Sequence, residues 1–219
     1  MSGEASSSTS RDARLTILAR VRQAQIRAHI PETKAGLPER LAYPPTTPAA
    51  RRARLLEEFK ILGVEAYVEE SEEAVRLRVR SLVTGKTILS WDADRLPYGI
   101  GEAVRGEKIY DGHDSKEDQG QAEIGLTGCQ NALAETGTLA MTSGQGRPRS
   151  ASLMPITHVV VIREADILQG MGEFFDGFRK SPELPYLVFI TGPSRTADIE
   201  LSLTLGVHGP GYLIVVIGP

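Results

Sequence analysis

A single carboxylate, Glu135, lies in a segment rich in small residues, IGLTGCQNALAETGTLAMTS, at residues 124–143. Two apolar runs, each short enough for a strand, flank a turn that is rich in glycine and amides. Small residues allow close approach of backbone to backbone, or of backbone to a ligand. Glu135 is therefore either a cap bonded to backbone amides or a pocket group beside Thr136, Gly137 and Thr138. We take it as the catalytic candidate and its three neighbours as ligand-binding candidates.

A second candidate site lies in the segment TGPSRTADIE, which follows an apolar run. We predict a helix at residues 196–205, whose first N–H groups stand beside the guanidinium of Arg195. Aligned amides and a guanidinium form a typical carboxylate or phosphate site. The alternative is that Ser194 only caps the helix while Arg195 pairs with an acid such as Asp198 or Glu200. The anion-binding candidates are Gly192, Ser194, Arg195 and Thr196.

Other polar side chains add weaker candidates. His208 lies in a Gly-rich loop after the predicted helix, where it could donate a proton or contact the anion, or bond a carbonyl instead. Arg147 and Arg149 lie in a loop that could close over a bound acid, although solvated surface arginines are the commoner case. Cys129 has no evident histidine partner and is interpreted as a small packed thiol. His158, beside a buried strand, is interpreted as structural.

The composition excludes several classes of function. The chain has 219 residues and a net charge of −3 without a concentrated basic excess, which argues against nucleic-acid binding. No apolar run approaches the roughly 18 residues that span a bilayer, and no signal-peptide core is present, so we expect a cytoplasmic protein away from the membrane. One cysteine cannot hold an iron–sulfur cluster, and the four histidines lack zinc-ligand spacing. We expect no metal and no cofactor.

Helix and strand patterns predict one large domain preceded by a helical arm. Residues 1–10 are Ser-rich and expected to be disordered. Residues 11–47 contain a helix from Arg11 to about Ala28 and then a Pro-rich linker. Residues 48–219 form the α/β domain.

Strands and helices alternate in this domain with short connections, which predicts a doubly wound, mostly parallel sheet with helices on both faces. Thr47 before Pro48 begins the first helix of the domain, and Gly63 ends it. Residues 111–121 are acidic and predicted to form a surface loop. The predicted strands are residues 64–68, 87–91, 108–111, 157–162, 186–190 and 212–217, and the predicted helices are residues 48–62, 72–84, 99–105, 167–179 and 196–205.

Three motifs together resemble the lactate-utilisation protein C family of LUD-domain proteins: LTGCQNALAETGTLAM, GRPRSASLMPITHVVVI and TGPSRTADIELSLTLGVHGPG. The resemblance covers about residues 50 to 218, with the motifs in the family's order. This family is similar to the superfamily of glucosamine-6-phosphate deaminase, ribose-5-phosphate isomerase and the CoA transferases. The resemblance implies the doubly wound α/β fold of that superfamily, with a pocket at the carboxyl ends of the strands.

The resemblance also implies a function. It indicates a component of a multi-protein system that oxidises L-lactate to pyruvate, in which separate lactate-utilisation proteins carry the iron–sulfur clusters. The chain itself would have no redox centre, and its ligand would be a small carboxylate or phosphate. Some CoA transferases use a glutamate in a small Gly-containing motif as a covalent nucleophile. By this likeness, a nucleophilic role for Glu135 is an alternative to its role as a cap.

Two other functions compete with this one. The chain could be a stand-alone CoA-transferase-like or sugar-phosphate-isomerase-like enzyme that uses Glu135 and the anion site at Arg195. It could also be a scaffold whose pocket is vestigial, because fold alone does not determine function in this superfamily.

Overall fold

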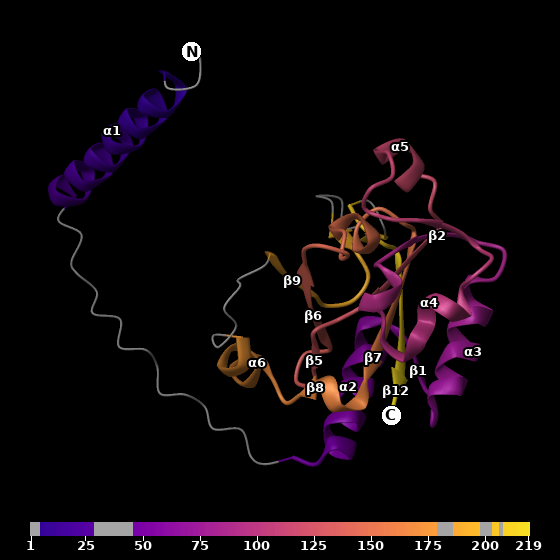
Figure 1. Ribbon diagram of the computed structural model, residues 1–219. Helices are drawn as coiled ribbons and strands as arrows, with labels where there is room; N and C mark the ends of the chain where they lie inside the picture. The colour runs from indigo at the N-terminus through magenta and orange to yellow at the C-terminus, as the bar shows by residue number, and fades with distance from the viewer. Residues whose placement is uncertain (1–4, 29–45, 179–185, 198–202, 206–207) are drawn as a thin grey trace. The chain divides into compact units, whose positions relative to one another are not determined.

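The computed structural model describes residues 5–28, 46–178, 186–197, 203–205 and 208–219 (Figure 1). The chain forms two compact units, Met1–Leu41 and Ala42–Pro219. The first unit contains helix α1 (Ala5–Arg27), which begins before the predicted start at Arg11, so residues 5–10 are helical where we expected disorder. Within the described ranges, no helix is long and apolar enough to cross a membrane.

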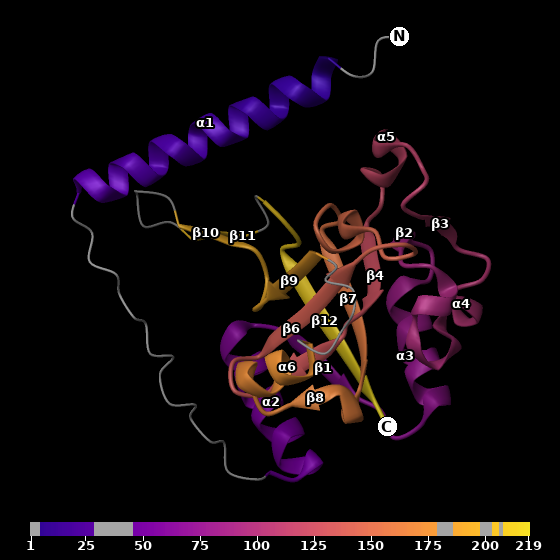
Figure 2. The same ribbon diagram turned by 60° about the vertical axis from the view of Figure 1, so that its left-hand side comes forward.

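The second unit is built on a six-stranded sheet in which every pair of neighbours is parallel, in the order β1-β12-β7-β4-β2-β3 (Figure 2). This arrangement confirms the predicted mostly parallel α/β sheet. The strands are β1 (Glu65–Val68), β2 (Thr87–Ser90), β3 (Lys108–Tyr110), β4 (Ile124–Gly128), β7 (Thr157–Arg163) and β12 (Tyr212–Gly218).

Helices cover both faces of this sheet, as predicted. Helix α2 (Pro48–Leu62) packs Leu55 and Phe59 on one face, together with Val160 of β7. On the other face, α3 (Glu72–Val83) and α4 (Ile100–Ala103) pack with Val159 and Val161. Successive residues of β7 point to opposite faces, and both faces are apolar, which explains the β-branched run Val159–Ile162.

Local sequence signals define the ends of α2. The side chain of Thr47 accepts a hydrogen bond from the amide of Ala50 at 3.2 Å, which caps the first turn. Gly63 ends the helix in the left-handed conformation at φ +75°, where glycine is favoured.

A second, four-stranded sheet in the order β8-β5-β6-β9 was not predicted. The segment at residues 124–143 crosses both sheets, because β4 is followed by an antiparallel β5–β6 hairpin. Strand β9 pairs antiparallel with β6, and helix α6 (Met171–Phe178) packs on this sheet through aromatic rings of Phe174, Phe175 and Phe189. The strands are β5 (Asn131–Leu133), β6 (Thr138–Ser143), β8 (Ile167–Leu168) and β9 (Tyr186–Ile190).

The predicted helix at residues 196–205 is wrong. Strands β10 (Arg195–Ala197) and β11 (Leu203–Leu205) pair antiparallel there, with Thr196 opposite Thr204. The sequence LSLTL alternates apolar and polar residues, a period of two that suits a strand. Asp198 and Glu200 lie outside the described residues.

Other boundaries also differ from the prediction. The helix predicted at residues 167–179 begins only at Met171, because Ile167 and Leu168 form β8, and its predicted end at Arg179 lies outside the described residues. A short helix interrupts the predicted loop at residues 111–121. The remaining short helices are α5 (Lys116–Gln119), η1 (Ala93–Arg95), η2 (Pro97–Gly99), η3 (Arg149–Ser152) and η4 (Glu164–Asp166).

Gly125 of β4 packs directly under η3. A Cβ atom at this position would lie 1.8 Å from the carbonyl oxygen of Ala151. We expect Gly125→Ala to lower the free energy of unfolding by about 3 kcal/mol, because the backbone of η3 must move. Urea denaturation of the variant and of the unaltered chain measures the difference in their free energies of unfolding.

Gly177→Ala in α6 is the matched control, because a Cβ there meets no atom within 4 Å. It should leave stability unchanged or raise it by up to about 1 kcal/mol through helix propensity. Similar small effects of both changes would contradict the close contact between β4 and η3.

Candidate functional site

A pocket of about 750 Å³ lies beyond the carboxyl ends of β4 and β2. Open parallel sheets bind ligands at this end of their strands. We call this cavity the carboxyl-end pocket. Gln130 and Asn131 reach it from the segment after β4, and Arg95 from the segment after β2. The complete lining consists of Arg95, Gln130, Asn131, Thr142, Ser143, Gly144, Gln145, Arg147, Leu168, Glu173, Phe174, Gly177 and Phe178.

Polar side chains of the pocket bind one end of the Arg147 guanidinium. Its Nη1 donates to Thr142 Oγ1 at 2.8 Å and approaches Gln130 Oε1 at 3.4 Å. Thr142 in turn donates to Gln130 Oε1 at 2.8 Å. Nε is buried, and it has no hydrogen-bond partner among the residues that the structure describes. A buried donor without a partner is costly, so Arg147 retains hydrogen-bonding capacity that its protein neighbours do not use.

Charges around the pocket favour an anion. Arg95 and Arg147 both line it, whereas Glu173 is its carboxylate. Glu173 is already engaged, because its Oε2 accepts from the amide of Gln169 at 2.8 Å and its Oε1 lies 3.7 Å from Arg51 Nη1. Arg95 is paired too, because its Nε lies 3.6 Å from Asp94 Oδ2, which leaves Arg147 as the lining charge without an ion-pair partner among the described residues.

Glu135 lies outside both pockets described here and caps a helix. Its Oε1 accepts a hydrogen bond from the amide of Met171, the first residue of α6, at 2.8 Å. Gly170 allows this approach, because a Cβ there would lie 2.3 Å from the carboxyl carbon of Glu135. The structure thus gives the carboxylate the cap role that was one of its two sequence interpretations, and a catalytic role stays a prediction.

The three residues after Glu135 connect elements of the fold. Thr138 lies 2.8 Å from the hydroxyl of Thr191 and 2.7 Å from that of Thr136, so a chain of hydroxyls joins β6 to the end of β9. Gly137, at φ +65°, packs on α2, because a Cβ there would lie 2.7 Å from Leu62 Cδ1. Their predicted ligand contacts stay predictions.

The anion site predicted at a helix start has no helix. Arg195 is exposed, and its Nη2 donates to the carbonyl oxygen of Leu62 at the end of α2. Thr196 belongs to β10, and its side chain lies outside the description. Gly192, Ser194 and His208 do meet, but around a different pocket.

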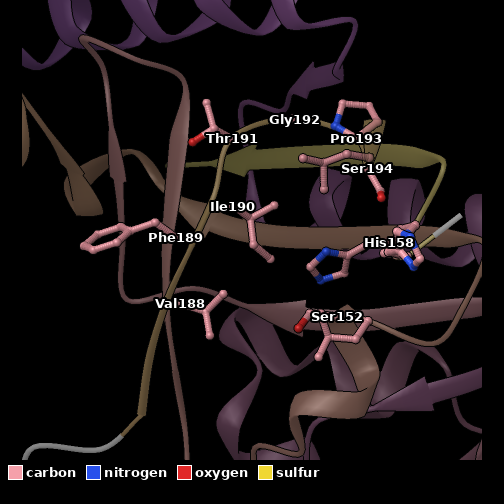
Figure 3. A pocket seen from close by; sticks show the side chains of 14 residues that line it. Ser152, His158, Val188, Phe189, Ile190, Thr191, Gly192, Pro193 and Ser194 are labelled. Carbon is pink, nitrogen blue, oxygen red and sulfur yellow. The ribbon is translucent and has the colours of Figure 1, made fainter. Parts of the chain in front are cut away.

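This second pocket, which we call the amino-end pocket, has a volume of about 260 Å³ and lies near the amino ends of β7 and β12 (Figure 3). Its lining is largely apolar, and Arg195 does not belong to it. The complete lining consists of Ser152, Leu153, His158, Val188, Phe189, Ile190, Thr191, Gly192, Pro193, Ser194, His208, Gly209, Pro210 and Leu213.

Two described polar residues of the amino-end pocket are buried: His158, with 1% of its surface exposed, and Ser152, with 8%. Nε2 of His158 lies 2.9 Å from the hydroxyl of Thr127 on the neighbouring strand β4. Burial lowers the pKa of His158 from 6.5 to about 3, so the ring is neutral near pH 7. Desolvation also raises the pKa of the Cys129 thiol, which is half-buried and packs against the cores on both faces of the sheet.

Sequence reasoning named Arg147 but missed the side chains that orient it. Gln130 and Thr142 are separate in the sequence and meet because β5 and β6 form a hairpin, in which the amide of Gln130 donates to the carbonyl of Ala140 at 2.9 Å. The signal that could have found them is the amide pair Gln130-Asn131 directly after the apolar run of β4.

The cap role of Glu135 makes a stability prediction. Glu135→Ala removes the acceptor for the first amide of α6 and should lower the free energy of unfolding by about 1 kcal/mol. Glu135→Gln keeps a carbonyl acceptor and should cost less than half as much. Urea denaturation of both variants is the measurement, and no loss in Glu135→Ala would contradict the cap.

The buried His158 makes stability depend on pH. The unfolded chain takes up a proton at this residue below about pH 6.5, whereas the folded chain does so only near pH 3, so stability falls as the pH drops through this window. Between pH 6.5 and 5.0 we expect a loss of ~1.5 kcal/mol from this group.

His158→Phe removes that dependence while the other titrating groups remain. The difference in unfolding free energy between the two proteins, measured at both pH values, isolates the histidine. Parallel pH profiles would refute the low pKa in the folded state.

Comparison with known proteins places the chain among bacterial relatives. A model of the LUD domain family matches residues 52–217. Lactate utilization protein C of Shouchella clausii is 36% identical over 135 residues, which cover 57% of this chain and 59% of that protein. Lactate utilization protein C of a Geobacillus species is 34% identical over 151 residues, with 60% and 63% covered. The chain thus spans about three fifths of the length of these relatives.

One solved structure matches the fold. The crystal structure of a DUF162 family protein from Deinococcus radiodurans aligns with a TM-score of 0.62 at 22% identity, covering 80% of this chain and 100% of that one. At this identity the likeness establishes the fold alone. Because the family model spans most of the sequence, this chain belongs to the LUD domain family.

Proposed function

We propose that this chain serves lactate utilisation as one component of a multi-protein system, and that it binds lactate or pyruvate in the carboxyl-end pocket. The names of its relatives support the pathway, and the pocket supports the ligand. The observation that carries the second part is the partly unused guanidinium of Arg147, which lies at the ligand-binding end of the parallel strands and has no ion-pair partner among the described residues.

A small carboxylate suits Arg147 chemically. A guanidinium binds a carboxylate through two parallel N–H donors, and Nη1 already serves Thr142. Because Nε is shielded by the protein, the ligand carboxylate would accept a hydrogen bond from Nη2. The side-chain amides of Gln130 and Asn131, which line the same pocket, would bond the hydroxyl or keto oxygen next to the carboxylate.

The volume of the pocket fits a shared site. Its roughly 750 Å³ lies in the range of pockets for much larger ligands, so a three-carbon acid fills only part of it. The remaining space would admit a reactive group from another component. In this proposal the electrons of lactate pass to an iron–sulfur-bearing lactate-utilisation protein, and this chain, a cytoplasmic component without its own redox centre, positions the acid.

The stand-alone alternatives depend on different residues. A CoA-transferase-like or sugar-phosphate-isomerase-like enzyme needs a free carboxylate at Glu135 and an anion site at Arg195. Glu135 is engaged by the amide of Met171, and Arg195 bonds the carbonyl of Leu62. Turnover of an acyl-CoA or a sugar phosphate by the isolated chain would favour this alternative.

Arg147→Gln tests the proposed carboxylate site. A charge-assisted hydrogen bond contributes roughly 1.5–3 kcal/mol, so the affinity for lactate or pyruvate should fall about tenfold or more. Calorimetric titration of the two acids and of inorganic phosphate measures it. Arg105→Gln is the matched control, because Arg105 is an exposed arginine that pairs with Glu102 on α4 and does not line the pocket.

The outcomes separate clearly. Loss of binding in Arg147→Gln but not in Arg105→Gln supports the site. Equal affinities of both variants, or no binding of either acid by the unaltered chain, would refute it. Thermal melting of both variants confirms that the fold is intact.

A further inference from the structure

We propose that the amino-end pocket is a second binding site, for a neutral ligand with an aliphatic body and a carbonyl group, and that Nδ1 of His158 donates a hydrogen bond to that carbonyl. The site lies near the amino ends of β7 and β12, whereas the carboxyl-end pocket lies beyond the carboxyl ends of β4 and β2. The proposal does not rest on the function proposed above.

The His158 ring lies inside the protein and still reaches the amino-end pocket. His158 is the second residue of β7. It is 1% exposed, yet its side chain lines the pocket. Figure 3 shows this side chain among those of Ser152, Ile190 and Ser194. A polar ring is therefore buried at the inner end of a pocket whose mouth is open to solvent.

The two ring nitrogens of His158 differ in their hydrogen bonding. Nε2 lies 2.9 Å from Thr127 Oγ1. Nδ1 has no hydrogen-bond partner in the part of the chain that the structure describes, and it is not among the fully shielded polar atoms there. A buried histidine normally uses both nitrogens, so an unpartnered Nδ1 facing a pocket indicates a missing partner.

The contact with Thr127 determines which ring nitrogen carries the proton in this proposal. Thr127 is fully buried, and among the described residues His158 is the partner of its hydroxyl. The hydroxyl hydrogen needs an acceptor, and Nε2 is the one available, so Thr127 donates and Nε2 accepts. In the neutral imidazole the proton then lies on Nδ1, which makes Nδ1 a donor toward the pocket.

The lining of the pocket determines the kind of ligand that would fit. The side chains of Val188, Ile190 and Leu213 give the pocket apolar walls, which suit an aliphatic body. A charged ligand would lose its hydration without gaining a guanidinium, because Arg195 is bonded to Leu62, and His208, the other histidine of the lining, is exposed to solvent. A ketone, ester or thioester carbonyl is a neutral acceptor and satisfies Nδ1 without this cost. The volume of about 260 Å³ limits the ligand to a small one.

The test uses 2-heptanone as the neutral probe and heptanoate as its charged counterpart, titrated into the full chain and followed by calorimetry and by ¹⁵N NMR of the histidine side chains. We expect 2-heptanone to bind more tightly than heptanoate. The ¹⁵N spectrum should show His158 protonated at Nδ1, and this signal should move on addition of the ketone.

Two variants locate the site. His158→Phe removes the donor and should weaken binding of 2-heptanone roughly fivefold or more. Val188→Phe fills the pocket without touching His158 and should abolish binding, which keeps the test decisive if His158→Phe does not fold. Arg105→Gln is the control and should bind as the unaltered chain does. No binding of 2-heptanone, equal binding by Val188→Phe, tighter binding of heptanoate, or a proton on Nε2 would each overturn the proposal.

Discussion

The rest of the molecule depends on the pairing of β4, β7 and β12 at the centre of the parallel sheet. β7 pairs with β12 along seven residues and with β4 along five, and apolar side chains cover both faces. Water is excluded from both sides, so the backbone groups must bond to neighbouring strands. That requirement holds the strand ends in register and sets the position of everything attached to them.

The carboxyl ends and the amino ends of the strands differ in chemistry, because different segments of the chain cover them. At the carboxyl ends, the β5–β6 hairpin and the loop that carries Arg147 present amides, hydroxyls and guanidinium groups. At the amino ends, the end of β9 and the segment around Pro210 present mainly apolar side chains, with His158 and His208 also in the lining. One sheet thus carries both pockets, one beyond the carboxyl ends of β4 and β2 and the other near the amino ends of β7 and β12.

The small antiparallel sheet orients the polar groups. Strand β6 carries Thr142, which bonds both Gln130 and Arg147, so the guanidinium is held by the hairpin rather than by its own loop alone. Helix α6 packs its aromatic face on this sheet and receives the carboxylate of Glu135 at its first turn. Because the helix and the hairpin share this contact, a change at Glu135 acts on the wall of the carboxyl-end pocket through packing.

The sequence by itself determined the features that depend on neighbours along the chain. Thr47 and Gly63 define the ends of α2, and the unbroken apolar runs of β7 and β12 indicate central strands covered on both faces. The motifs sufficed to recognise the family, and Arg147 was named as a candidate from its loop.

Only the tertiary structure decided the features that depend on distant partners. The period of LSLTL suits a strand, yet the turn residues around Arg195 suggested a helix start, and pairing with β10 settled the conflict. Glu135 reads equally well as a cap or as a reactive group until Met171 is placed beside it, because burial and partners set the role of a carboxylate. Likewise, His158 lies 31 residues from Thr127 in the chain, so the contact between its Nε2 and the Thr127 hydroxyl follows from the register of β4 and β7.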